Sequence, residues 1–367
     1  QYASRSWRSS NIMPPPARWW YYFLMAEMNT QPLVSVIVVT LNNINLLKKC
    51  MESLDGQSYK NIEVIVVDNG STENIKSLLD WDFPEAVYIR LPENRGFAGG
   101  NNAGFAKSRG QYVALINNDA EASPGWIEAM VNAARADQKI GMVASVIVDG
   151  NDPLALDSIG LGVAFDGMSR QAWMGKPVPQ LIAPMEVLMP SGCACMYRAS
   201  ALKEAGFFDK DFFAYCEDSD LGLRLRFAGW KAVAAPGAVV THYYSMTMGR
   251  YSSRKLYLVE RNHYWVAVKN FPLIALPFIP LVTLWRYLLS LYLLAGGGKS
   301  PAAPLSENGA LPLLSAVARA NFHMLLKLPK MLKKRLSNRK LKRLGTAAQL
   351  SLMRKFALPM RRIMGEK

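Results

Sequence analysis

The feature that most constrains the fold is a short apolar stretch, residues 112–116, which ends abruptly in Asn117, Asn118 and Asp119. Such a run, bounded by turn-forming residues, is typical of a strand buried in a parallel sheet. Ligands of open α/β sheets bind just beyond the carboxyl ends of the strands, so we expect Asp119 at a binding edge. Its carboxylate suits Mg²⁺ or Mn²⁺, which can hold a diphosphate. A turn, or a cap for the helix expected near Pro124, would explain the same aspartate without a ligand.

Three earlier segments share this pattern of an apolar run that stops at polar residues. Strands are expected at residues 34–40, 62–67 and 87–91, with helices at 46–54 and 73–79. Strands that alternate with helices indicate a parallel sheet built from βαβ units. The polar residues that end the strands would then gather at one edge of the sheet. The sequence therefore predicts an α/β fold with a binding site at that edge.

Two further segments could contact a nucleotide. Asp68 directly follows the second strand, where its carboxylate could accept a hydrogen bond from a uracil or thymine ring or from a ribose hydroxyl. The sequence Asp-Asn-Gly-Ser at residues 68–71 is equally typical of a turn. Residues 94–104 contain four glycines, and we expect a loop there that allows the backbone to approach a phosphate or a base closely. This loop has neither the P-loop ending nor the dinucleotide-binding spacing.

The second half of the chain carries acids at the expected start of a helix. Residues 143–190 are less periodic, and short strands are expected within them. Glu217, Asp218 and Asp220 then follow several aromatic residues. Acids in a first helical turn are often simple caps that interact favourably with the helix dipole. Aromatic walls would instead raise the pKa of Glu217 or Asp218 toward the range of a general base. A short strand at 239–242 ends in His242, and a lone histidine is more often structural than a ligand.

The positive charge is concentrated at the C-terminus. Residues 319–367 contain fifteen Lys and Arg residues and one acid, which leaves 28 basic and 27 acidic residues in the rest. Amphipathic basic helices are expected at 311–328 and 331–352, and they suit an anionic lipid surface. A basic tail could also bind nucleic acid. The regular leucines and the apolar segment beside the tail favour lipid, so no nucleic acid is expected. A helical subdomain packed on the rest of the protein remains the soluble alternative.

The apolar segment 273–295 is long enough to span a bilayer, but Pro277, Pro280 and Arg286 interrupt it. A single crossing would also place the basic tail outside the cytoplasm, against the positive-inside tendency. We therefore predict a re-entrant or interfacial segment. The four cysteines lack zinc-site spacing and are interpreted as reduced thiols of a cytosolic domain.

Five motifs occur in an order that resembles family 2 glycosyltransferases. They are residues 36–42, 66–71, 94–97, 117–119 and 217–220. The resemblance covers residues 32–271 and implies the GT-A fold, a Rossmann-like mixed sheet, and inversion at the anomeric carbon. The implied division is an extension at 1–27, a catalytic domain at 28–271, a membrane segment at 272–298 and a basic tail at 299–367. The subgroup looks like bacterial rhamnosyltransferases of O-antigen and cell-wall assembly, which use dTDP-rhamnose.

The resemblance also implies a role for each motif residue. Asp218 would be the base that deprotonates the acceptor hydroxyl, with Glu217 beside it. Asp119 would bind Mg²⁺ or Mn²⁺, and His242 would assist at the metal or the diphosphate. The nucleotide would be lined by Thr40, Asn42, Asp68, Arg95, Gly96 and Asn118. The metal motif, Asn-Asn-Asp, has one carboxylate where the family has two or three, so metal binding is weak or His242 supplies a ligand.

These expectations describe an inverting transferase at the cytoplasmic face of the bacterial inner membrane, attached peripherally or monotopically. It would move rhamnose from a nucleotide-diphospho-sugar donor onto a polyprenyl-diphosphate-linked saccharide. The alternatives are a transferase for a UDP-sugar such as galactofuranose or GlcNAc, and a non-catalytic nucleotide-binding scaffold. The preferred function requires Asp68, Asp119 and Asp218 to converge on one cleft.

Overall fold

A ten-stranded mixed sheet forms the centre of the structure, a computed structural model that describes residues 31–243, 252–295 and 309–360. All of the following concerns the compact unit formed by residues 33–367. Four parallel strands make one half of the sheet in the order β3-β2-β1-β4. They are β1 (Val34–Thr40), β2 (Ile62–Asp68), β3 (Val87–Arg90) and β4 (Tyr112–Asn117). The predicted parallel βαβ series is therefore present.

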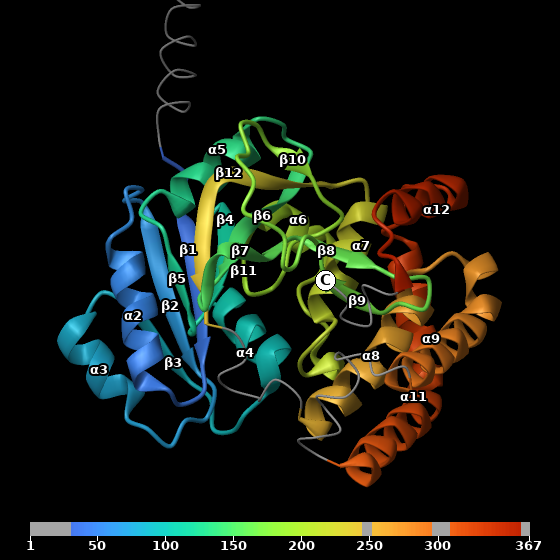
Figure 1. Cartoon of the computed structure of the whole chain (residues 1–367). Coiled ribbons are helices and arrows are strands. Elements are labelled where there is room, and N and C mark those ends of the chain that lie inside the picture. The colour runs from blue at the N-terminus through green and yellow to red at the C-terminus, as the bar shows by residue number, and fades with distance from the viewer. Residues whose placement is uncertain (1–30, 244–251, 296–308, 361–367) are drawn as a thin grey trace, which may run out of the picture. The chain divides into compact units, whose positions relative to one another are not determined.

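The other half of the sheet mixes strand directions (Figure 1). β11 (Ala194–Arg198) runs antiparallel between β4 and β6 (Ile140–Asp149). β12 (Lys231–His242) is parallel to β6, so the strand predicted at 239–242 is only the end of a longer one. Three strands pair at the margins: β5 (Ala120–Ala122), β7 (Asp152–Ile159) and β10 (Met185–Glu186). β8 (Leu161–Val163) and β9 (Ser169–Gln171) form a separate hairpin.

Alternate residues of β1 face two different cores, because successive side chains of a strand point to opposite faces. Val36 and Val38 pack with α2, α3 and α5 on one face, and Ile37 packs with α4 and residues of α6 and α7 on the other. The helices are α2 (Ile44–Asp55), α3 (Ile75–Asp82), α4 (Gly96–Phe105), α5 (Trp126–Arg135), α6 (Ala199–Ala205), α7 (Glu217–Phe227) and α8 (Ser253–Asn270). A sheet covered on both faces explains why its central strands are continuous apolar runs.

The glycine-rich segment 94–104, which we expected to be a loop, is mostly the helix α4. Its glycines allow the helix to lie directly on β1. A Cβ atom at Gly100 would come within 2.6 Å of a methyl of Val39, and one at Gly104 within 2.5 Å of a methyl of Ile37. Helix propensity disfavours glycine by about 1 kcal/mol per residue. Close packing on the strand overrides that local preference here.

The C-terminal helices also differ from the prediction. The expected break near residue 330 is absent, because α11 (Ala310–Arg339) continues through Pro329 and lies beside α8 (Figure 1). The chain turns after α11 and continues as α12 (Thr346–Lys355). Arg335 of α11 donates a 2.8 Å hydrogen bond to the carbonyl of Val268 of α8. The tail thus includes a helix packed on the rest of the protein.

The apolar segment forms η2 (Leu273–Phe278) followed by α9 (Ile279–Ala295). Residues 273–293 are long and apolar enough to cross a bilayer, yet one face of α9 is tied to α8. Arg286 makes a bidentate ion pair of 2.7 and 2.8 Å with Glu260 of α8, and a 2.9 Å bond to Asp166. The opposite face exposes Leu284, Leu288 and other apolar side chains.

We expect Gly104→Ala to destabilise the protein by roughly 1–3 kcal/mol, because the added methyl group would overpack the contact with Ile37. Urea unfolding measures this change. Gly56→Ala is the matched control, because the backbone there has an ordinary φ of −71° and a Cβ would meet nothing closer than 3.6 Å. Equal stability of the two variants would contradict the role of Gly104 in packing.

Candidate active site

A cavity of about 390 Å³ opens at the carboxyl ends of β1 and β4. Its position agrees with the rule that ligands of α/β sheets bind beyond the strand ends. The lining includes most of the predicted residues: Thr40, Gly96, Asn118, Asp119, Glu217, Asp218 and His242. Three other predicted residues, Asn42, Asp68 and Arg95, lie outside the described lining.

Asp119 and His242 face each other on the floor of this cavity. In the sheet, His242 of β12 pairs with Ala120 of β5, the residue that follows Asp119. His242 Nε2 lies 3.3 Å from Asp119 Oδ1, and its other ring nitrogen, Nδ1, lies 2.8 Å from Asp157 Oδ2. Burial lowers the pKa of His242, but the neighbouring Cys193 and the two carboxylates outweigh it, so the pKa is raised above its usual value.

This pair fits a divalent cation that is completed by a substrate. Mg²⁺ is commonly held by one or two protein groups plus substrate phosphates, and imidazole is an accepted ligand of other divalent ions. Asp157 would hold the ring in the orientation that points Nε2 at the ion. Across residues 31–243, 252–295 and 309–360, no group of three or more His, Cys, Asp or Glu side chains has metal-holding geometry. The donors beyond Asp119 and His242 would therefore come from the substrate and from water.

Glu217 and Asp218 stand at the start of α7 in contrasting environments. Asp218 accepts hydrogen bonds from the backbone amide of Gly192 (3.2 Å), and from the amide (2.7 Å) and hydroxyl (3.2 Å) of Ser219. Glu217 is buried, and no described residue donates to or accepts from its Oε2. Burial raises the pKa of both carboxyls, and the charge of Asp218 raises that of Glu217 further. Asp218 is therefore the member of the pair that ionises first.

The loop before this pair is held in an uncommon backbone conformation. Phe213, Tyr215 and Cys216 have φ values of 66°, 69° and 67°, a region that non-glycine residues rarely adopt. The side-chain amide of Asn262, buried in α8, donates to the carbonyls of Phe212, Ala214 and Tyr215 at 3.0, 2.9 and 2.7 Å. Such strain persists only where the surroundings fix it. Asn262 was not predicted, because nothing in the local sequence marks it.

The opposite side of the cavity is lined by the ends of β1 and β4 and the start of α4. Asn118 donates a 3.1 Å hydrogen bond to the hydroxyl of Thr40, which fixes both polar groups at the cavity wall. Gly96 is required there, because a Cβ atom would lie 2.3 Å from the carbonyl oxygen of Phe213. Asn69 and Asn94 also line this side and were not predicted.

The expectation that three aspartates line one cleft holds for Asp119 and Asp218 but not for Asp68. The buried carboxylate of Asp68 accepts hydrogen bonds from the amide of Ser71 (2.7 Å) and the hydroxyl of Tyr88 (2.9 Å), and it pairs with Arg90. Burial raises its pKa, but these donors outweigh burial and hold the pKa below its usual value. In this structure Asp68 shapes the turn after β2.

Asn42 and Arg95 are also engaged outside the lining. The side-chain oxygen of Asn42 accepts a 2.8 Å hydrogen bond from the amide of Thr72, which joins the loops that follow β1 and β2. The backbone amide of Arg95 donates a 2.9 Å bond to the side chain of Asn69, and Arg95 itself is exposed. Any contact of these two residues with a nucleotide stays a prediction.

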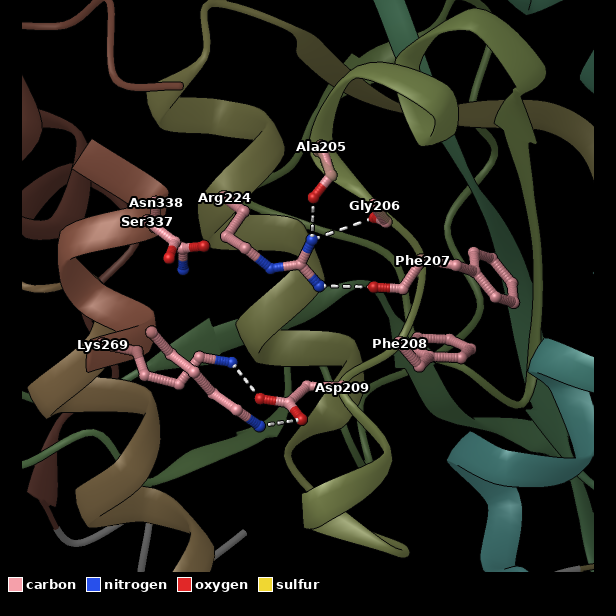
Figure 2. Close-up of a pocket in the computed structure, with 10 residues that line it drawn as sticks. Ala205, Gly206, Phe207, Phe208, Asp209, Arg224, Lys269, Ser337 and Asn338 are labelled. Carbon is pink, nitrogen blue, oxygen red and sulfur yellow. Dashed lines mark hydrogen bonds and ion pairs between the residues drawn. The ribbon is translucent and has the colours of Figure 1, made fainter. Parts of the chain in front are cut away.

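A second pocket, of about 240 Å³, lies where α11 meets α7 and α8 (Figure 2). Arg224 donates to the carbonyls of Ala205, Gly206 and Phe207, and Asp209 joins Lys269 of α8. Lys334 of α11 also pairs with Asp209, at 2.5 Å. Asp220 pairs with Arg224 and Lys269, and Asp211 pairs with Lys334, so each cation of the pocket has a carboxylate partner. We interpret this pocket as the junction that holds α11 against α7 and α8.

The family model described as Glycosyl transferase family 2 matches residues 35–206. This match, together with the similarity to proteins named as glycosyltransferases, supports the predicted family 2 glycosyltransferase. The predicted fold class and the predicted enzyme class are both confirmed.

Three known proteins illustrate the similarity. "Uncharacterized protein y4gI" of Sinorhizobium fredii is 30% identical over 236 residues, which cover 60% of this chain and 26% of that protein. The N-acetylglucosaminyl-diphospho-decaprenol L-rhamnosyltransferase of Mycobacterium tuberculosis is 26% identical over 269 residues, which cover 63% of this chain and 85% of that enzyme. The structure of the mannosyltransferase PcManGT from Pyrobaculum calidifontis, in complex with GDP-Man and Mn²⁺, matches with a TM-score of 0.51 at 18% identity. The match covers 89% of this chain and 93% of that one, and it supports the fold alone.

We expect Asn262→Ala to lower kcat roughly a hundredfold, because a displacement of about 1 Å at a reacting group costs that much. Affinity for the nucleotide donor should change little, since the side-chain nitrogen of Asn262 donates to carbonyls of the loop before Glu217 and Asn262 does not line the cavity. Steady-state kinetics and donor titration separate these effects. Asn321→Ala is the control, because that side chain donates only to its own helix at Val317. A large loss of donor affinity would contradict a role confined to the loop.

Proposed function

We propose that this glycosyltransferase moves a sugar, with L-rhamnose from dTDP-rhamnose as the first choice, onto a saccharide linked to a polyprenyl diphosphate. The observation that carries the proposal is one cavity that holds both the Asp119–His242 pair and the Glu217–Asp218 pair. The first pair suits a metal-bound diphosphate, and the second suits removal of a proton. Transfer of a sugar from a nucleotide diphosphate with inversion needs both functions side by side.

Each group of the cavity would have one task in a single displacement. Asp218, as the carboxylate, would accept the proton of the acceptor hydroxyl while the oxygen attacks the anomeric carbon. Gly192 and Ser219 would hold that carboxylate in place by their hydrogen bonds. Thr40, Gly96 and Asn118 would contact the nucleotide. A bound Mg²⁺ or Mn²⁺ would supply positive charge for the departing diphosphate, and Asp119 and His242 would hold the ion.

The choice of rhamnose rests on a relative. The mycobacterial enzyme that shares 26% identity is named for transfer of L-rhamnose to an N-acetylglucosaminyl-diphospho-decaprenol. That name supports an acceptor carried by a polyprenyl diphosphate. A role in the synthesis of surface polysaccharide, such as O-antigen or cell wall, is part of the same proposal. A UDP-sugar donor is the alternative, since the groups described at the nucleotide wall do not single out thymine.

A lipid-linked acceptor also accounts for the apolar surface of the C-terminal helices. The outer face of α9 exposes Leu284, Trp285, Leu288 and Leu291, and α11 exposes Leu314, Phe322 and Leu325. α11 also carries several basic residues, which anionic lipid would attract. We propose that this surface, formed by α9 and α11, rests on the cytoplasmic leaflet of the inner membrane. The ion pair of Arg286 with Glu260 favours a helix in the plane of the interface over one that crosses it.

The decisive experiment separates donor binding from transfer. Asp218→Asn should abolish transfer of rhamnose and leave the affinity for dTDP-rhamnose with Mn²⁺ nearly intact. Asp119→Asn should remove the metal-dependent part of donor binding, as should EDTA with the unaltered protein. Calorimetric titration and a transfer assay measure the two effects, with Asp80→Asn in an exposed ion pair as control. A UDP-sugar that binds in place of dTDP-rhamnose would favour the alternative donor.

The pH dependence tests the assignment of the base. Burial raises the pKa of Asp218 and, more strongly, that of Glu217. Because the base acts only when ionised, kcat should fall as the pH is lowered, beginning above the usual range of an aspartate. Glu217→Gln leaves the donors to Asp218 in place, so the acid limb should persist. An inactive Glu217→Gln with an active Asp218→Asn would reverse the two roles.

We expect Leu284→Asp with Leu291→Asp to reduce binding to anionic vesicles by at least tenfold, because each buried leucine contributes about 1.5 kcal/mol or more. Sedimentation with phosphatidylglycerol vesicles measures this, and transfer to a soluble acceptor should stay unchanged. Leu154→Asp, at an exposed leucine of β7, is the control. Equal binding by both proteins would show that the surface of α9 does not meet lipid.

A further inference from the structure

Three basic side chains line the active-site cavity on the side of the catalytic base. Arg254 and Lys255 belong to the first turn of α8, and Arg170 belongs to β9. The guanidinium carbon of Arg254 lies 5.4 Å from the ring centre of Phe213, and the ammonium nitrogen of Lys255 lies 5.3 Å from that of Tyr215. Both rings are in the strained loop that leads to Glu217.

Arg170 is tied to the same region by its neighbour in the sequence. The hydroxyl of Ser219, which follows Asp218, is hydrogen-bonded to the hydroxyl of Ser169 at 2.7 Å. The three cations are therefore attached, through separate contacts, to residues 213–219. None of them belongs to the Asp119–His242 pair or to the wall formed by β1 and α4.

This positive charge has no task in the transfer as described so far. The donor diphosphate would already have the metal as its counter-charge. An acceptor carried by a diphosphate brings a second strongly negative group into the cavity, close to the carboxylate of Asp218. In a partly enclosed site that repulsion is far larger than in water. A second set of cations is therefore required on the side of the base, where these three side chains lie.

We propose that Arg170, Arg254 and Lys255 form a binding site for the diphosphate of the lipid-linked acceptor. The inference rests on the proposed function and names the group that recognises the acceptor. A guanidinium stacked on an aromatic ring keeps its N–H groups directed outward at its edge, where they can pair with phosphate oxygens. The sugar attached to the diphosphate would then lie next to Asp218.

The position of α8 also gives the lipid chain a direction. The helix that carries Arg254 and Lys255 in its first turn binds α9 through Glu260, about one and a half turns further along. A diphosphate held at the start of α8 would thus lie on the helix that binds α9, and the opposite face of α9 is the apolar one. The polyprenyl chain could follow that surface away from the cavity.

The test compares ligands that differ only in the diphosphate. Three ligands are titrated by calorimetry: an alkyl diphosphate sugar, the neutral alkyl glycoside of the same sugar, and the nucleotide donor with Mn²⁺. In Arg254→Ala, Arg170→Gln and Lys255→Met, affinity for the alkyl diphosphate sugar should fall roughly tenfold to a hundredfold, as expected for loss of a charge-assisted hydrogen bond. Affinity for the neutral glycoside and for the donor should stay within twofold.

Two further variants test whether the loss of affinity comes from the charge of these side chains. Lys107→Met removes an exposed charge outside the cavity and should change none of the three affinities. Arg254→Lys keeps the charge and should recover part of the loss, which a merely structural role would not predict. Weaker donor binding with an unchanged alkyl diphosphate affinity would assign the cations to the donor and overturn the proposal. Equal losses for the charged and the neutral acceptor would overturn it too.

Direct binding separates this inference from the proposed function. If the unaltered protein binds the alkyl diphosphate sugar through these cations but transfers no sugar to it, only the proposed reaction fails. If transfer to the neutral glycoside proceeds and the variants bind the diphosphate normally, only the acceptor site fails.

Discussion

The position of the proposed base, Asp218, depends on one buried amide. Asn262 is enclosed in α8, and its side chain holds three carbonyls of the loop that leads into Glu217 and Asp218. That loop contains three residues with positive φ, each of which costs free energy unless its surroundings fix it. The same loop meets α4, because the amide of Ala98 donates a 3.0 Å bond to the carbonyl of Phe213. The helix α4 and the amide of Asn262 thus set the distance between the proposed base and the wall formed by β1 and α4.

The acidic side chains of the cavity lie in different environments, so each can have a different role. The carboxylate of Asp218 receives three hydrogen bonds, whereas Glu217, beside it, is buried without such support at Oε2. Two neighbouring carboxyls have different pKa values when their environments differ. Here the hydrogen bonds to Asp218 and the burial of Glu217 separate the two pKa values. Asp119 lies beside His242, which is far from it in the sequence. Asp157 orients the ring of His242.

The sequence was most informative where local pattern and tertiary packing agree. Runs such as residues 34–40 and 62–67 are β-branched and apolar, so the parallel strands and their polar ends could be predicted. Asp119 and Asp218 were found because each follows such a strand or starts a helix. The helix α4 was predicted as a loop, because its glycines are explained by close packing on β1, which is about 60 residues earlier in the chain. Asp157 and Asn262 were not predicted as site residues for the same reason, because their partners are close only in the folded protein.

Asp68 shows the converse limit. The residue was predicted correctly at the end of β2, and its carboxylate accepts hydrogen bonds from Ser71 and Tyr88 and pairs with Arg90. The pattern of a strand followed by Asp-Asn-Gly-Ser does not distinguish a turn from a ligand contact, because both need the same carboxylate in the same place. The partners seen in the structure support the turn, and a contact of Asp68 with a nucleotide stays a prediction.

The ion pair between Arg286 and Glu260 has a mechanical consequence. Both side chains are buried, and removal of one partner would leave an uncompensated charge, so the joint between α9 and α8 resists bending. A flat surface that captured the leucines of α9 would thereby fix the tilt of the whole cavity. Encounter with a carrier confined to that surface would become a search in two dimensions with a preset angle of approach. A flexible linker in place of this ion-paired joint would not fix that angle.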